Sequence, residues 1–76
     1  MTIAELIRSC RGKMPLEDFA LRCRTTYQSV GQWERGESLP TLGKLDILAD
    51  IMELPYLGLL LQWVSEKRRR EGYCDR

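Results

Sequence analysis

The sequence predicts a single all-α domain of five short helices, and three observations support this fold class. The 76 residues are enough for one domain only. Apolar residues recur at intervals of three and four along most of the chain, whereas no stretch alternates between apolar and polar residues as a half-buried strand does. The hydrophobic fraction of 43% and the charged fraction of 30% are ordinary for a globular protein and argue against disorder.

The first two helices have recognisable starts. The first runs from a Thr2 cap to about Arg11, and Gly12 ends it. Its apolar face consists of Ile3, Leu6, Ile7 and Cys10. Pro15 suits the first turn of a second helix, because the missing N–H has no partner to lose there. The inward side of the second helix consists of Phe19, Ala20 and Cys23.

The third and fourth helices each follow a threonine. Thr26 can cap a third helix, Tyr27–Arg35, which Gly36 closes. Thr41 can cap a fourth helix. The apolar positions of the fourth helix are Leu42, Leu45, Leu48, Ala49 and Met52.

A fifth helix begins at Pro55 and runs to about Arg70, and its first half is apolar nearly all round. Its expected core residues are Tyr56, Leu59 and Trp63. A second apolar stripe consists of Leu57, Leu60, Leu61 and Val64. This stripe predicts a homodimer interface, with an oversized core as the alternative. We expect the domain to span residues 1–71 and residues 72–76 to form a flexible tail.

The second and third helices are joined by a short polar turn at residues 24–26. Two short helices with such a turn form a helix-turn-helix unit, whose second helix can enter the DNA major groove. Ala20 is small enough to let the two axes cross closely, so that the second helix meets Val30 and Trp33 of the third. The side chains left facing outward near the start of the third helix are Tyr27, Gln28, Ser29 and Gln32. Such side chains can reach base edges, and glutamine can pair bidentately with adenine.

Residues 25–36 read Thr-Thr-Tyr-Gln-Ser-Val-Gly-Gln-Trp-Glu-Arg-Gly. This segment resembles the recognition helix of the lambdoid phage repressors and Cro proteins. Four later residues follow the fourth helix of that family: Pro40, Leu45, Leu48 and Ala49. Ile7 and Arg8 match its Leu-Arg pair if the first loop here is one residue longer. The resemblance covers roughly residues 3–60 and implies a five-helix lambda repressor-like DNA-binding domain.

The resemblance also implies roles for single residues. The base contacts that it implies are Tyr27, Gln28, Gln32 and, as a fourth, Ser29. It assigns a phosphate contact to Thr26, and a structural ion pair to Arg8 and Glu34. Two departures weaken the expected phosphate clamp: Leu16 replaces the glutamine usual in the family, and Glu37 stands where many relatives are basic.

Four basic residues are further candidates for phosphate contact: Arg11, Lys13, Arg35 and Lys44. The first two lie beside the start of the second helix, and a solvated role is the alternative for the last two. The basic run at 67–70 is expected as a solvated helix end, with a contact to the DNA backbone as the alternative. Gly31 costs about 1 kcal/mol relative to alanine inside a helix. We expect close approach of DNA or tight helix packing to offset this cost.

Other function classes find no support in the composition. The three cysteines, at positions 10, 23 and 74, are too few for a disulfide framework, and an odd number cannot all pair. No histidine is present. We therefore expect no enzyme activity, no metal and no other cofactor. Cys10 and Cys23 are expected as reduced thiols of the core. Without a signal peptide or an apolar run long enough to span a membrane, a cytoplasmic, nucleoid-associated protein of bacterial or phage origin is expected.

These patterns predict a regulator of transcription that binds double-stranded DNA sequence-specifically. We expect it to act as a repressor. A homodimer would bind an inverted-repeat operator with half-sites about one DNA turn apart. The alternative is a protein-interaction module of the same fold, such as an antirepressor, an antitoxin or an adaptor. Leu16, Glu37 and the net charge of +1 favour the alternative slightly, whereas the polar start of the third helix favours DNA.

Overall fold

The structure is a computed structural model that describes residues 2–70, and these residues form five helices and no strand. The helices are α1 (Ile3–Arg11), α2 (Leu16–Arg22), α3 (Tyr27–Arg35), α4 (Leu42–Met52) and α5 (Tyr56–Arg70). The predicted all-α fold class is confirmed. The predicted tail, residues 72–76, lies outside the described residues. None of the five helices combines the length and the apolar character that a membrane crossing needs.

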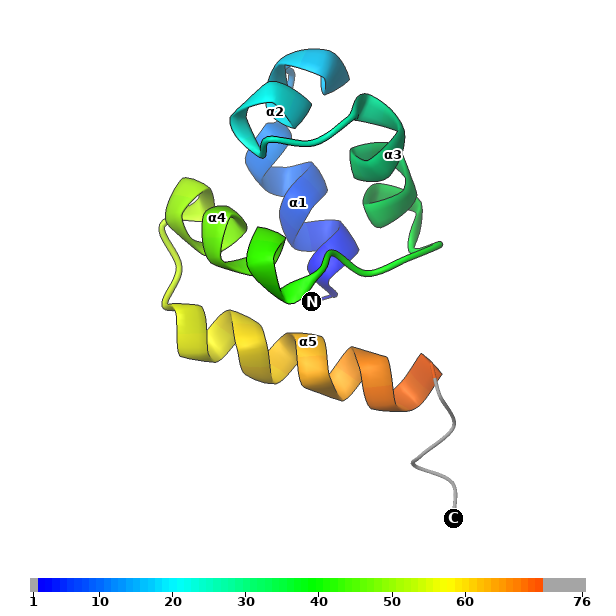
Figure 1. The fold of residues 1–76 in the computed structure, drawn as a ribbon, viewed down its shortest axis with the longest axis vertical. Helices are drawn as coiled ribbons and strands as arrows, with labels where there is room; N and C mark the ends of the chain where they lie inside the picture. Colours follow the sequence, from blue (N-terminus) through cyan, green and yellow to red (C-terminus); the bar gives the residue numbers. More distant parts are fainter. Residues whose placement is uncertain (1, 71–76) are drawn as a thin grey trace.

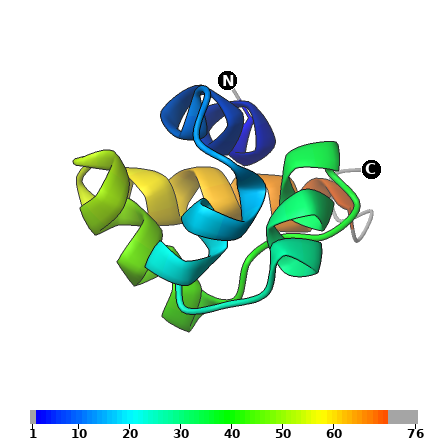
Figure 2. The same cartoon turned by 90° about the horizontal axis from the view of Figure 1, so that it is seen from above.

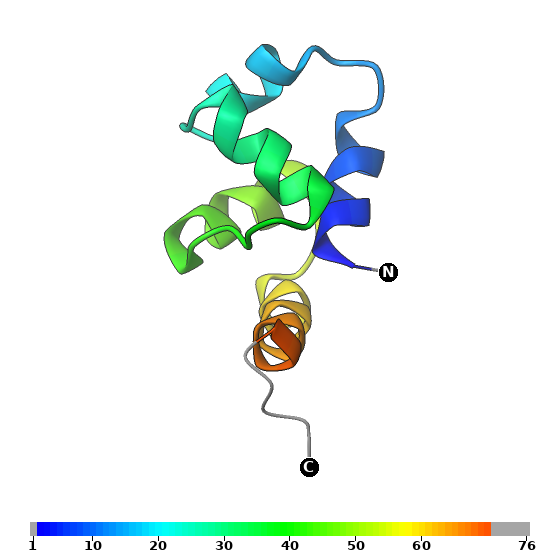
Figure 3. The ribbon, with the colours of Figure 1, turned by 90° about the vertical axis from the view of Figure 1, so that its right-hand side faces the viewer.

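The first four helices pack around one core, and α5 lies across one end of it (Figure 1). Seen from above, α1, α3 and α4 lie around α2, with α5 beneath them (Figure 2). Figure 3 shows α5 nearly end-on, below α4 and the start of α1. The main helix contacts join α3 to both α1 and α2, and α5 to both α4 and α1. The second and third helices therefore form the end of the molecule that is farthest from α5.

The core follows the predicted apolar spacing. Its buried residues are Ile3, Ile7, Phe19, Ala20, Cys23, Val30, Trp33, Leu45, Leu48, Ala49 and Leu59. Burial raises the pKa of the Cys23 thiol to about 11, which keeps this cysteine protonated and unreactive.

Three residues expected in the core are exposed instead. Cys10 is exposed at the C-terminal end of α1, where the last buried residue is Ile7, one turn earlier. Leu42 and Tyr56 are also exposed, and each is the first residue of its helix, where the chain has only begun to turn toward the core. Helical spacing alone therefore overestimates burial at helix ends.

Threonine side chains begin three of the helices, as predicted. The Thr2 hydroxyl accepts the N–H of Glu5 at 3.2 Å, and the Glu5 carboxylate accepts the N–H of Thr2 at 2.9 Å. This hydrogen bond from the Thr2 backbone lowers the pKa of Glu5. Thr26 and Thr41 cap α3 and α4 in the same way through their hydroxyl oxygens. Pro15 stands immediately before α2.

Side-chain hydrogen bonds hold α5 against the other helices. The indole N–H of Trp63 donates to the carbonyl oxygen of Pro40 at 2.7 Å. At the other contact, the Glu66 carboxylate accepts the backbone N–H of Ile3 at 2.7 Å. Lys67 stacks its ammonium over the Trp63 ring, 5.6 Å from the centroid. The second half of α5 is thus tied both to the loop before α4 and to the start of α1.

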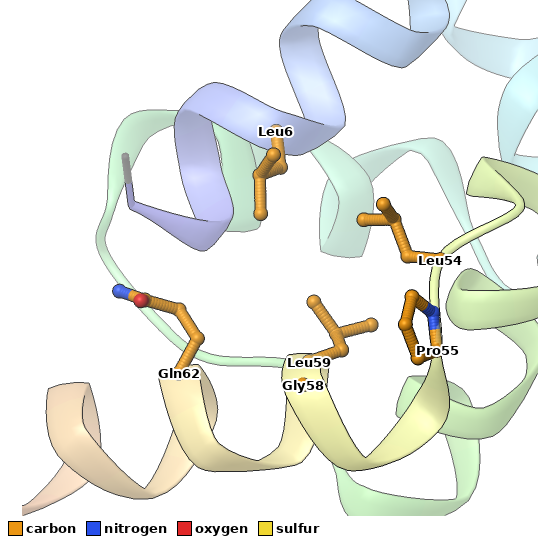
Figure 4. A pocket seen from close by; sticks show the side chains of 6 residues that line it. All are labelled: Leu6, Leu54, Pro55, Gly58, Leu59 and Gln62. Carbon is orange, nitrogen blue, oxygen red and sulfur yellow. The ribbon is translucent and has the colours of Figure 1, made fainter.

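An apolar hollow of about 300 Å³ separates the first half of α5 from α1 (Figure 4). It is lined by Leu6, Leu54, Pro55, Gly58, Leu59 and Gln62. Leu6 reaches into it from α1 and Leu59 from α5, whereas Gly58 contributes no side chain. Beyond this hollow, the hydrogen bond from Ile3 to Glu66, one turn after Gln62, joins the two helices directly.

The turn between α2 and α3 contains a strained arginine. Arg24 has a φ of 58°, in the left-handed region that glycine adopts freely and other residues adopt at a cost. The turn closes through the N–H of Thr25, which donates to the carbonyl of Ala20 at 3.0 Å. Arg24 itself is exposed, so its side chain can be removed without opening the core.

Arg24→Gly should raise the free energy of unfolding by about 0.5–1 kcal/mol, because relief of the left-handed strain exceeds the added entropy of the unfolded chain. Arg22→Gly is the matched control, since it makes the same change at the exposed last residue of α2 and should destabilise by up to about 1 kcal/mol. Denaturant unfolding followed by circular dichroism measures both. A loss of stability in Arg24→Gly equal to that in Arg22→Gly would contradict the strained turn.

Candidate nucleic-acid interface

Helices α2 and α3 meet in the predicted helix-turn-helix arrangement. The side chains expected between them are all buried: Phe19, Ala20, Cys23, Val30 and Trp33. The Thr26 hydroxyl accepts the N–H of Ser29 at 3.2 Å and so fixes the start of α3. Because Val30 and Trp33 point into the core, the opposite side of α3 faces solvent.

Three polar side chains are exposed along this outer side, and we call them the α3 polar row: Tyr27, Gln28 and Gln32. Tyr27 keeps 50% of its surface exposed. Ser29, the fourth residue predicted to contact a base, is half-buried and accepts a hydrogen bond from the Thr26 hydroxyl at 3.2 Å. The row borders a hollow of about 480 Å³ whose other lining residues are Leu16, Gly31 and Arg35. The structure thus brings three of the four predicted base-contacting residues to the exposed face of one helix.

Glu34 is the one buried charged side chain among residues 2–70, with 8% of its surface exposed. Its carboxylate binds Arg11, at 2.6 Å from Nε and 2.9 Å from Nη2. The remaining guanidinium nitrogen, Nη1, donates to the carbonyl of Met14 at 2.8 Å. Hydrogen bonding to Glu34 raises the pKa of Arg11, so the arginine stays charged.

The expected ion pair between Arg8 and Glu34 is therefore wrong, because Arg8 is exposed and Arg11 takes the role. The loop after α1 explains the exchange. Met14 in that loop offers its carbonyl oxygen to the same guanidinium that binds Glu34, and this second acceptor holds Arg11 in place. The family pattern correctly predicts an ion pair between α1 and α3, but the arginine that forms it lies one helical turn later than expected.

Residues 7–59 match the family model described as helix-turn-helix, which is more than half of the chain. The chain belongs to the lambda repressor-like helix-turn-helix family. Neither a curated protein nor a solved structure matches it. The family is one of DNA-binding regulators, and its match extends across the helix-turn-helix of α2 and α3 to the first turn of α5.

Three of the four basic residues expected at the DNA backbone of this helix-turn-helix protein are engaged within it. Arg11 forms the ion pair described above, the Lys44 ammonium donates to the carbonyl of Arg24 at 2.6 Å, and Arg35 pairs with Glu37. Lys13 is exposed in the loop before α2, and Thr26 is exposed at the start of α3. Phosphate contact therefore remains a prediction that depends mainly on Lys13 and Thr26.

Two contacts at the loop after α3 are not apparent from the sequence. Arg35 pairs with Glu37, at 2.9 Å between Nε and Oε2, because the left-handed turn at Gly36 folds the chain back. The hydrogen bond between them raises the pKa of Arg35 and lowers that of Glu37. Arg70 of α5 donates to the carbonyls of Gly36 at 2.8 Å and Glu37 at 2.6 Å. The glycine is a local signal for the first contact, whereas the second joins residues 34 apart and has no local signal.

Arg11→Ala should lower the free energy of unfolding by about 1–3 kcal/mol, because it leaves the Glu34 carboxylate buried without its partner. Arg8→Ala is the matched control, since it removes an exposed arginine from the same helix and should change stability by less than about 0.5 kcal/mol. Chemical denaturation at neutral pH compares the two variants. Equal losses in both would contradict the assignment of Arg11 as the partner of Glu34.

Proposed function

We propose that this protein is a transcriptional repressor that binds an inverted-repeat operator as a homodimer, with α3 in the major groove. The observation that carries the proposal is the α3 polar row, which is exposed on a helix whose other side is anchored in the core. We place its action in the cytoplasm, at the nucleoid, as a bacterial or phage-encoded protein.

The two glutamines of the α3 polar row suit the reading of base edges. A glutamine amide carries one donor group and one acceptor, which match N7 and N6 of adenine in the major groove. Gln28 and Gln32 are four residues apart and so lie one above the other on α3, along the direction in which a recognition helix follows the groove. Tyr27 adds a hydroxyl donor at the N-terminal end of α3, which is the end of a recognition helix that contacts base edges in the major groove.

Phosphate contacts would orient the helix rather than read the sequence. Lys13 lies in the loop before α2 and Thr26 immediately before α3, and both are exposed. The N-terminus of α3 also favours an anion, because the first N–H groups of a helix point outward and carry partial positive charge.

The dimer is proposed to form through α5. Its exposed apolar side chains, which we call the α5 outer stripe, are Leu57, Leu61 and Val64. Both leucines are 71% exposed, and the spacing of four and three places all three residues on one helix face. Leu60, which we also expected in the interface, is half-buried and packs on the protein's own core. The proposed interface therefore pairs three side chains from each copy across a two-fold axis.

The alternative, a protein-interaction module such as an antirepressor, an antitoxin or an adaptor, has its own support. Two expected phosphate contacts, Arg11 and Lys44, are engaged inside the protein. Leu21 of α2 is 77% exposed beside a hollow that Tyr27 also lines, and an exposed leucine suits a protein partner better than a DNA backbone. A protein that selects no DNA sequence would favour this alternative.

Gln28→Ala and Gln32→Ala should each weaken binding to the selected operator by about 1–3 kcal/mol while leaving binding to random duplexes nearly unchanged. The reason is that each variant loses contacts to base edges but none to the backbone. Selection from random duplexes followed by gel-shift titration measures both affinities. Ser9→Ala, at an exposed site of α1, is the control and should bind the operator as the wild type does. Equal losses on operator and random duplexes would rule out base reading.

Leu61→Glu should convert the protein from a dimer to a folded monomer and greatly weaken operator binding, because a charge enters the middle of the α5 outer stripe. Leu21→Glu is the control, since it places the same charge on an equally exposed leucine of α2 and should leave the dimer intact. Sedimentation at micromolar concentration measures the oligomeric state. A monomeric wild type, or a dimeric Leu61→Glu variant, would exclude the α5 interface.

A further inference from the structure

The guanidinium of Arg35 covers Gly31 on the outer side of α3. A Cβ added at Gly31 would lie 3.1 Å from Nη1 of Arg35 and 3.7 Å from Cδ2 of Leu16. Long side chains of a helix lean toward its N-terminus, which explains how the last residue of α3 reaches back by one turn. Gly31 is therefore buried beneath a charged group, and a side chain at this position would have to displace the Arg35 guanidinium.

Arg35 consequently shares a surface with the α3 polar row. The hollow beside that row is lined by Arg35 and Gly31 as well as by the row itself. A residue at the C-terminal end of a recognition helix would ordinarily lie beyond the bases. The backward lean places the guanidinium at the level of Gly31, between the positions of Gln28 and Gln32 in the chain.

Glu37 holds the guanidinium in this position. Its carboxylate accepts Nε–H at 2.9 Å and one N–H of Nη2 at 3.3 Å. The backbone of Glu37 is itself fixed, because its N–H donates to the carbonyl of Gln32 at 2.9 Å and its carbonyl accepts from Arg70 at 2.6 Å. The carboxylate therefore extends from an anchored backbone, which limits the positions that the arginine can take.

The donors that remain on Arg35 match the edge of a guanine. A guanidinium has five N–H groups, and Glu37 engages one on Nε and one on Nη2. The two groups on Nη1 and the second group on Nη2 stay available, and two of them point in parallel from adjacent nitrogens. We propose that Arg35 is a specificity-determining residue that reads a guanine through O6 and N7, and that Glu37 positions it. This proposal rests on the proposed function, since it requires α3 to lie in the major groove.

The charge of the pair favours a base over a phosphate. Arg35 and Glu37 together carry no net charge, so their joint attraction for the DNA backbone is weak. Hydrogen bonding to a guanine depends on the geometry of two parallel donors, which the ion pair with Glu37 leaves in place. Glu37 would therefore lower the affinity for random DNA while the ordered arginine raises the affinity for one sequence, and both effects increase specificity.

The test is binding-site selection and salt titration with the full-length protein and three variants: Arg35→Lys, Arg35→Ala and Glu37→Gln. The wild type should enrich one guanine in each half-site, and replacement of that guanine should weaken its binding about 10- to 100-fold. Arg35→Ala removes the guanidinium, so it should bind all four bases at that position within about threefold, whereas Arg35→Lys keeps the charge but loses the planar two-donor edge and should retain only part of the preference. Glu37→Gln should bind random duplexes more tightly, with a slope of log affinity against log salt steeper by about one, because Arg35 is then free to bind a phosphate.

Three results would overturn the proposal. Retention of the full guanine preference by Arg35→Ala would exclude Arg35 as the residue that reads this base. An equal loss on all duplexes in Arg35→Ala, with a shallower salt slope, would make Arg35 a phosphate contact, and the proposed function would stand without this inference. A wild type that enriches no sequence would overturn the proposed function and this inference together. Both side chains of the pair are more than half exposed, so melting temperatures near that of the wild type should show that the variants fold.

Discussion

The buried carboxylate of Glu34 is the constraint on which the position of α3 depends. A charge in the core is costly unless an opposite charge and hydrogen bonds accompany it. Arg11 provides both and also binds the Met14 carbonyl, so α1, the first loop and α3 have one arrangement that satisfies all three groups. With Trp33 buried beside it, α3 is held in one rotation about its axis. The α3 polar row faces outward as a consequence of that rotation.

The second half of α5 extends this frame to the loop that follows α3. Trp63 binds the carbonyl of Pro40, and Arg70 binds the carbonyls of Gly36 and Glu37. The helix that we propose as the dimer interface therefore contacts the same loop that positions Arg35 through Glu37. In a dimer held by α5, the spacing between the two recognition helices would be set by these hydrogen bonds, which is what an operator with fixed half-site spacing requires.

Much of this fold is predictable from the sequence, because it is specified locally. Thr2, Thr26 and Thr41 mark helix starts through their own hydroxyl groups, and the apolar spacing of each helix identifies most of the core. The sequence predicts that an arginine of α1 pairs with Glu34, but it does not predict which arginine. Arg11 takes this role because the first loop places the carbonyl oxygen of Met14 within its reach. The contact of Arg70 depends on how α5 crosses the loop after α3, and no local pattern in the sequence encodes that crossing. The sequence identifies Arg35 as a basic residue near the end of α3. It does not predict that the Arg35 side chain extends back over Gly31.

The proposed function requires that the outer face of α3, rather than α5 or α2, meets DNA. A nuclear magnetic resonance titration of the isotope-labelled protein with its selected duplex tests this most directly. The largest shifts should occur at the backbone amides of residues 26–32, at the side-chain amides of Gln28 and Gln32, and at Nε of Arg35. Shifts confined to α5 or to the surface around Leu21, with those of α3 unchanged, would contradict the proposed function.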